Sequence, residues 1–334
     1  MAAFEWKAST ALVLGLVLLV ACDRSGGETG PGSESSSLAQ FEQTNRDWRA
    51  RRLQRLTDPH GWLSLVGLIP LEPGRQSIGS GPDNDIVLPG GPADWGSLEI
   101  GNEAVRFEVA EGVRQGGGGS GVTIDGRLLP SAVLVVGGED GPTKVEAGGI
   151  QVHLVRPGGR LALRVRDPDA ETRTGFAGLD YFPLDPDWRV EARFVAHPAG
   201  TTLQVANVMG QLIDEPNPGL AVFERDGQTI SLQAVLEGDR LFFIFADRTS
   251  GRETYGLGRF LYADLPGDDD TVTLDFNQSY NPPCAFSAYT TCPLPPQANR
   301  IPIPIRVGEQ SYAGRPGIRQ PVDVGDDVPA FKTP

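Results

Sequence analysis

Short runs of alternating apolar and polar residues, separated by glycine, proline and aspartate, dominate the chain from residue 61 onward. This period of two is typical of half-buried strands, and the turn residues between the runs indicate hairpins and loops. An Asp-Gly pair at residues 125–126 predicts a tight hairpin turn. Over residues 61–158 the pattern therefore predicts a β-sandwich, whose strands include residues 86–88, 105–109, 122–124, 133–136 and 150–155.

A second β module is predicted for residues 159–312, as an antiparallel sandwich or barrel. In residues 161–167 leucine and valine alternate with arginine, and the same period recurs in residues 189–194 and 272–276. The wholly apolar run 241–245 predicts a strand buried on both faces, which returns through residues 253–262. The fold class expected for the chain is thus mostly β.

One amphipathic helix is predicted before the first sandwich, within residues 38–60. Phe41, Trp48 and Leu56 have helical spacing, Ser37 suits the N-cap, and the Asp-Pro pair at 58–59 ends the pattern. This segment also carries five arginines, which favours either attraction to anionic lipid or ordinary pairing and solvation on an acidic β domain. They are Arg46, Arg49, Arg51, Arg52 and Arg55.

The N-terminus has the pattern of an export signal. Lys7 precedes an uncharged run over residues 8–21, which is shorter than the roughly 20 residues of a spanning helix. The small residues before Cys22 resemble the bacterial lipoprotein cleavage box. We expect removal of residues 1–21 and a lipid anchor at Cys22, which would place the protein in the cell envelope, bound to a membrane. An ordinary signal peptide or a short membrane anchor is the alternative.

Two further segments have the composition of unstructured chain. Residues 22–37 are mostly glycine, serine and acidic residues and predict a flexible tether. Residues 313–334 are rich in proline, glycine and charge and predict a disordered tail.

The charge balance excludes one class of partner. The 334 residues contain 43 acidic and 29 basic side chains, for a net charge of −14. Nucleic acid is therefore not an expected partner, because its binding depends on neutralising phosphate. No dinucleotide, phosphate-loop or zinc-protease motif occurs, so we expect no cofactor and no metal.

With Cys22 acylated, Cys284 and Cys292 remain as an even pair in a compartment that permits disulfides. A disulfide between them would stabilise the fold by about 2.5 kcal/mol in the loop-entropy model. A metal pair or a nucleophilic thiol is the alternative.

The first module resembles the forkhead-associated (FHA) family, a β-sandwich whose loops bind phosphothreonine. The resemblance rests on Gly74, the Ile-Gly pair at 78–79, residues 85–88 and the hairpin at 122–126. The family has arginine after the Ile-Gly pair, whereas this chain has Ser80. Residues 96–99 also depart from the family's Ser-Arg-x-His loop. We therefore expect an FHA-like scaffold without phosphothreonine binding.

Most of the chain after residue 61 is similar to the bacterial family known as domain of unknown function 1684 (DUF1684). The blocks that carry this resemblance are residues 61–68, 181–183, 245–264, 274–286 and 291–300. The resemblance implies architecture and prokaryotic origin, and it implies no activity.

Two function hypotheses follow from the polar residues of the second module. The leading one is a binding or scaffolding protein for a polar ligand, such as a glycan, or for an envelope partner, with candidate ligand-binding residues Arg164, Arg166, Asp275, Asn277, Tyr280 and Asn281. The alternative is an envelope hydrolase with candidate catalytic residues Asp247, Glu253, Tyr255 and Arg259. The hydrolase requires these four side chains to converge in one pocket. Separate ion pairs would argue against it.

Overall fold

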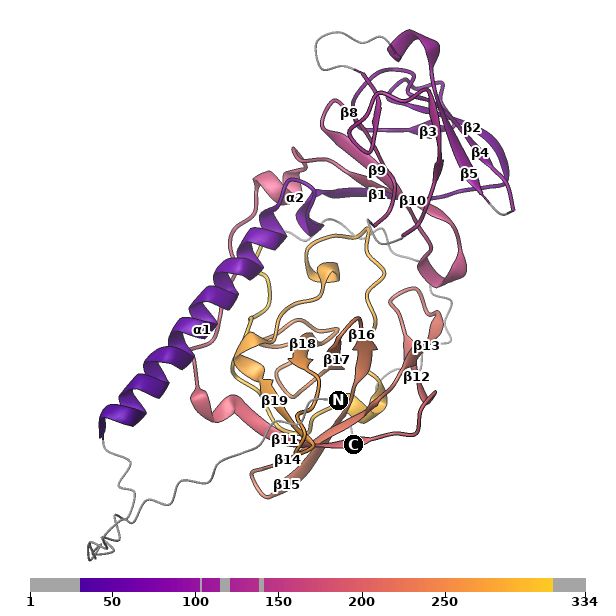
Figure 1. Ribbon diagram of the computed structural model, residues 1–334. Coiled ribbons are helices and arrows are strands. Elements are labelled where there is room, and N and C mark those ends of the chain that lie inside the picture. Colours follow the sequence, from indigo (N-terminus) through magenta and orange to yellow (C-terminus); the bar gives the residue numbers. More distant parts are fainter. Residues whose placement is uncertain (1–30, 103, 115–120, 138–140, 315–334) are drawn as a thin grey trace, which may run out of the picture. The chain divides into compact units, whose positions relative to one another are not determined.

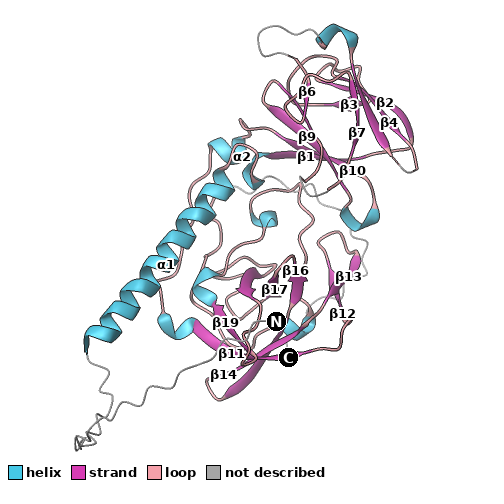
Figure 2. Cartoon of the chain, in the orientation of Figure 1, coloured by secondary structure: helices cyan, strands magenta, loops and turns pink. Residues whose placement is uncertain are grey.

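The computed structural model describes residues 31–102, 104–114, 121–137 and 141–314. The predicted signal, Cys22 and nearly all of the predicted tail lie outside these residues. Residues Met1–Gln40 and Phe41–Pro334 are two separate compact units. The described part contains nineteen strands and is mostly β, which confirms the predicted fold class (Figure 2). None of its helices is long and apolar enough to span a membrane.

Helix α1 (Pro31–Thr57) ends as predicted but begins earlier than expected. It starts at Pro31 and not near Leu38, so the flexible tether predicted over residues 22–37 extends too far. Proline suits the first turn of a helix, because its missing N–H group would have no partner there. The helix ends before the Asp-Pro pair at 58–59, since the residue before proline disfavours helical geometry. Its buried face mixes apolar Phe41 and Leu56 with polar Asn45 and Arg52.

The first β module consists of two five-stranded sheets around one core (Figure 1). One sheet has the order β1 (Leu65–Pro70), β10 (Ala162–Arg166), β9 (Ile150–Val155), β8 (Lys144–Ala147), β6 (Thr123–Ile124). The other has the order β3 (Ile86–Val87), β2 (Gly74–Gly79), β4 (Gly96–Ile100), β5 (Val105–Val109), β7 (Ser131–Leu134). Trp95 and Phe107 fill the core with the aliphatic side chains of both sheets. The FHA resemblance stays a prediction.

Strand β10 belongs to the first module, so the predicted boundary at residue 159 is wrong. β10 lies between β1 and β9 and pairs antiparallel with both. Its Leu163 and Val165 are buried in the core of the first sandwich. Alternation alone indicated a strand here but could not identify its neighbours. The chain leaves the sandwich after Arg166 through the short helix α2 (Glu171–Thr174).

The second module packs a four-stranded sheet against a three-stranded one. The first has the order β15 (Gln228–Gln233), β14 (Gly219–Arg225), β11 (Arg189–Ala196), β19 (Thr271–Asp275). The second has the order β16 (Val235–Glu237), β17 (Arg240–Phe245), β18 (Arg259–Asp264), and a hairpin of β12 (Thr202–Ala206) and β13 (Leu212–Pro216) is separate. β17 is buried on both faces, as predicted. Phe243 and Phe245 enter the core between the sheets, whereas Phe242 and Ile244 face a second cluster.

The strand predicted over residues 253–262 begins only at Arg259. Residues 247–258 form consecutive turns, in which the backbone N–H groups of Gly251, Arg252 and Glu253 donate to nearby carbonyls. Gly258 has φ +93°, and a Cβ atom there would lie 2.5 Å from the Phe245 carbonyl. Glu253 and Tyr255 therefore lie in these turns and not on the strand that carries Arg259.

Candidate ligand-binding pocket

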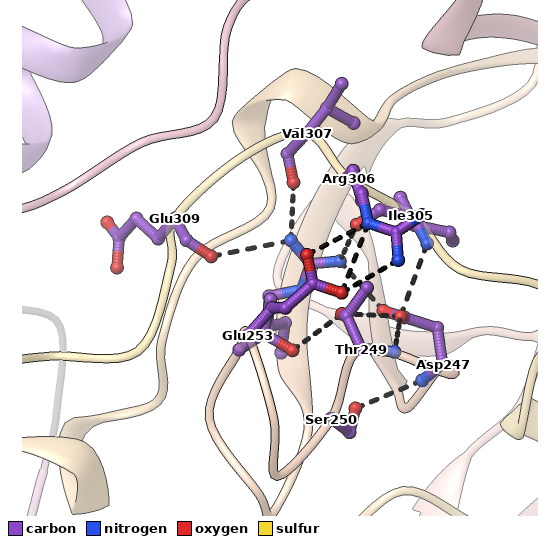
Figure 3. Close-up of polar contacts among 10 residues, drawn as sticks. Asp247, Thr249, Ser250, Glu253, Ile305, Arg306, Val307 and Glu309 are labelled. Atoms are coloured by element: carbon purple, nitrogen blue, oxygen red, sulfur yellow. Dashed lines mark hydrogen bonds and ion pairs between the residues drawn. The ribbon is translucent and has the colours of Figure 1, made fainter.

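Asp247 and Arg259 form an ion pair in the interior of the second module. The Arg259 Nη2 atom lies 2.8 Å from Asp247 Oδ2, and neither side chain has exposed surface. Figure 3 shows Asp247 with its neighbours Thr249 and Ile305. Arg259 also donates to the carbonyls of Ile305 and Val307, and Asp247 accepts from the Thr249 N–H and hydroxyl. These contacts tie residues 305–307 to β18 and to the turn after β17. The pair is thus part of the internal scaffold.

Glu253 and Tyr255 have partners elsewhere. At the surface, the Glu253 carboxylate accepts hydrogen bonds from Nε and Nη2 of Arg306. The shortest of these, from Nε to Oε2, is 2.9 Å. This hydrogen bond, more than any other effect, lowers the pKa of Glu253. The Tyr255 hydroxyl donates to the Cys284 carbonyl. The four candidate catalytic side chains do not converge, and the hydrolase hypothesis loses the geometry that it required.

A second buried ion pair joins α1 to the end of the described chain. Arg52 Nε lies 2.8 Å from Glu309 Oε1, and the Glu309 side chain has no exposed surface. The same carboxylate accepts the Asn281 N–H at 2.8 Å, and the Arg52 Nη2 atom also donates to the Asn281 carbonyl. Asn281 is thereby held inside the protein and does not face a ligand site.

Asp275 and Asn277 have local structural roles. Asp275 accepts the N–H and the side-chain amide of Asn277, and its other oxygen accepts from Asn45 on α1. Asn277 also exchanges two hydrogen bonds with the backbone of Asp185. Both residues fix the end of β19 against neighbouring segments. Their amide and carboxylate groups are already used within the fold.

One cavity has a volume of about 1160 Å³ and lies within the unit Phe41–Pro334. Its walls come from α1, β10 and strands β16 to β18. Six arginines line it against three carboxylates, although the chain as a whole is strongly acidic. We call it the arginine pocket, after Arg51, Arg52, Arg55, Arg164, Arg166 and Arg240. Its carboxylates are Asp58, Glu215 and Glu237.

Two of these arginines, Arg164 and Arg166, are largely buried, and neither forms an ion pair with a carboxylate of the described residues. They are two positions apart on β10 and so project to the same face. Both guanidinia lie over the Trp62 ring, at 5.4 and 5.8 Å from its centroid. Arg166 donates to the carbonyls of His60 and Gly61. The Nε atoms of both are buried and unsatisfied.

The electrostatic consequence is a site with excess positive charge. Burial lowers the pKa of Arg164, and burial followed by the charge of Arg164 lowers the pKa of Arg166 to about 10. The negative charge of Asp58 opposes the shift at Arg166 only in part. Adjacent buried charges of one sign are costly unless a counter-charge joins them. An anion in the pocket would remove this cost.

The charges of Arg164 and Arg166 also act on His153 of β9. Burial, followed by the charges of Arg166, Arg164 and Lys144, lowers its pKa to about 4. An unfolded chain binds this proton near pH 6.5. The unfolded state therefore gains a proton between about pH 6.5 and pH 4 that the folded state does not, so the free energy of unfolding falls as pH decreases across this window.

Between pH 7.5 and pH 4.5, we expect the free energy of unfolding to fall by about 1–3 kcal/mol less in His153→Gln than in the unmutated protein, at roughly 1.4 kcal/mol per pKa unit. Urea unfolding of both proteins at pH 7.5 and at pH 4.5 measures the difference. His197→Gln, in the second module, is the matched control. Identical pH dependence in His153→Gln and the unmutated protein would contradict the assignment.

Aromatic rings form a continuous surface on another part of the pocket. Tyr262 stacks on Phe242 with 4.7 Å between ring centroids, and it lies parallel to Tyr280 at 6.3 Å. Tyr280 in turn contacts Trp48 of α1 at 6.2 Å. We call these four residues the aromatic wall. The hydroxyl of Tyr262 donates to Glu237, which places an acceptor beside the wall.

Cys292 also lines the pocket, and Cys284 lies directly behind it. The Cys284 N–H group lies 3.1 Å from Cys292 Sγ, and both side chains are buried. The disulfide between them stays a prediction.

The structure thus brings together part of the predicted binding set. Arg164, Arg166 and Tyr280 line the pocket, whereas Asp275, Asn277 and Asn281 do not. Sequence reasoning missed Trp48, Trp62, Arg240, Tyr262 and the role of Arg51, Arg52 and Arg55. The high arginine content of the helix in an acidic chain was the available signal. No group of three or more metal-binding side chains occurs within the described residues.

Comparison with known proteins assigns no chemistry to this pocket. Residues 174–310 match the family described as "Protein of unknown function (DUF1684)". The chain is similar to the solution NMR structure of the uncharacterized protein from gene locus rrnAC0354 of Haloarcula marismortui, with 33% identity over 43% of this chain and 81% of that chain and a TM-score of 0.36. No curated protein matches the chain. The predicted family is confirmed for residues 174–310, and the block at 61–68 lies outside the match.

Proposed function

The chain carries a DUF1684 domain over residues 174–310, and we propose that it is a lipid-anchored envelope protein that binds an anionic polar ligand in the arginine pocket. The lipid anchor would be Cys22, and the disulfide of Cys284 and Cys292 would fit the same compartment. Binding is favoured over hydrolysis because Asp247 and Arg259 pair in the interior, whereas Glu253 pairs separately with Arg306 at the surface.

The observation that carries the proposal is the buried Nε–H group of Arg164, which has no hydrogen-bond acceptor among the described residues. An arginine has five N–H donors, and that of Nε is buried here without an acceptor. Planar guanidinia bind carboxylate and phosphate oxygens in a bidentate manner, and such charge-assisted hydrogen bonds are stronger than neutral ones. The Trp62 ring, 5.4 Å from the guanidinium, packs against Arg164 beside the cavity.

We expect inorganic phosphate to raise the melting temperature of the mature protein at constant ionic strength, because a ligand of the folded state stabilises it. Arg164→Ala should weaken phosphate binding by about 10–100-fold, since a hydrogen bond to a charged group contributes roughly 1.5–3 kcal/mol. Calorimetric titration measures the affinity.

Two further variants make this test specific. Arg164→Lys keeps the charge but loses the planar fork, so an intermediate affinity is expected. Arg160→Ala removes an exposed arginine that lies just before β10 and outside the pocket. This variant should bind phosphate as tightly as the unmutated protein does. Unchanged binding by Arg164→Ala, or no effect of phosphate on the unmutated protein, would refute the proposed site.

A further inference from the structure

Apart from its arginines, the arginine pocket is lined by the aromatic wall and by carboxylates. A bare anion would need only the surroundings of Arg164 and Arg166. The cavity of about 1160 Å³ extends beyond these residues to strands β16 to β18, where Trp48, Tyr262 and Tyr280 contribute ring surface. The ligand that fits the whole cavity therefore carries more than its charged group.

The groups along the wall favour a partner with hydroxyls. Glu237 beside Tyr262 and Glu215 elsewhere in the lining supply acceptor oxygens that bind O–H donors well. Tyr262 is fixed by its hydrogen bond of 2.6 Å to Glu237 and by its stacking on Phe242. A rigid ring of this kind offers a large contact area at a low entropic cost. A hydroxyl-rich ring would therefore contact the aromatic face and hydrogen-bond at its edge.

We infer, resting on the proposed function, that the ligand is an acidic saccharide of at least two rings, with its carboxylate or phosphate at Arg164 and Arg166 and a sugar ring on the aromatic wall. The size follows from the volume, which is slightly above the roughly 300–1,000 Å³ usual for small-molecule pockets and exceeds what one sugar ring fills.

Calorimetric titration of the mature protein with five probes tests this inference. Two probes are acidic disaccharides, trehalose 6-phosphate and digalacturonate, which separate phosphate from carboxylate as the charged group. The others are trehalose, inorganic phosphate and AMP. We expect one of the acidic disaccharides to bind at least tenfold more tightly than phosphate, trehalose or AMP, because only it contacts both parts of the pocket.

A tyrosine pair provides the matched variants. Tyr262→Ala should reduce the ratio of disaccharide affinity to phosphate affinity to near one, since the ring that contacts the sugar is lost. Tyr289→Ala removes an exposed tyrosine outside the pocket and should keep the original ratio. An unchanged ratio in Tyr262→Ala would overturn the placement of the sugar on the wall.

The outcomes separate the two proposals. If phosphate binds and neither acidic disaccharide binds more tightly, the saccharide is refuted and the anion site stands. If AMP binds most tightly, the wall receives a nucleobase and the saccharide is again refuted. If none of the probes binds, both the saccharide and the proposed function are refuted.

Discussion

Replacing Asp247 by alanine is expected to lower the free energy of unfolding by about 3–5 kcal/mol, because the variant leaves a buried guanidinium without its counter-charge. Arg259 is fully buried and lies 2.8 Å from this carboxylate. The backbone and hydroxyl of Thr249 would also lose their acceptor. Equilibrium unfolding in urea measures the change.

Two comparisons isolate the cause. Glu253→Gln breaks the exposed ion pair with Arg306 and should change the free energy of unfolding by less than about 1 kcal/mol, as is typical of surface pairs. The double variant Asp247→Ala/Arg259→Met removes both buried charges and should recover part of the loss, since no unpaired charge remains. A loss below about 1 kcal/mol in Asp247→Ala would contradict the structural role.

Replacing Glu309 by alanine is expected to cost a similar 3–5 kcal/mol and to loosen the helix. Its carboxylate is the buried partner of Arg52 on α1, and it also accepts the Asn281 N–H. Without it, residues 41–57 lose their principal charged contact with the β structure. Local opening exposes backbone to proteases, so trypsin should cleave at the arginines of α1 faster than in the unmutated protein.

The exposed pair of Glu42 and Arg46 on the same helix is the control for this prediction. Glu42→Gln breaks an ion pair of 3.2 Å at the surface and should alter neither trypsin cleavage nor stability by more than about 0.5 kcal/mol. The double variant Arg52→Met/Glu309→Leu should be more stable than Glu309→Ala. Trypsin cleavage at an unchanged rate in Glu309→Ala would show that other contacts hold the helix.

The sequence by itself determined the local structure, because the period of a strand and the chemistry of a turn are properties of neighbouring residues. The Asp-Gly pair at 125–126 adopts positive φ at both positions, as its hairpin requires, and the apolar run 241–245 is buried on both faces. Alternation also placed Arg164 and Arg166 on one face of a strand, which lines the pocket.

Only the tertiary structure decided which residues meet. Asp247 and Glu253 are near each other in sequence, but they form different ion pairs. Asp247 is buried and pairs with Arg259, whereas Glu253 is exposed and pairs with Arg306. The pocket combines an N-terminal helix, a strand of the first sandwich and a sheet of the second module, and no local pattern specifies such distant pairings. The physical reason is that a charge distant in sequence acquires its partner, or remains without one, only when packing fixes its neighbours and excludes water.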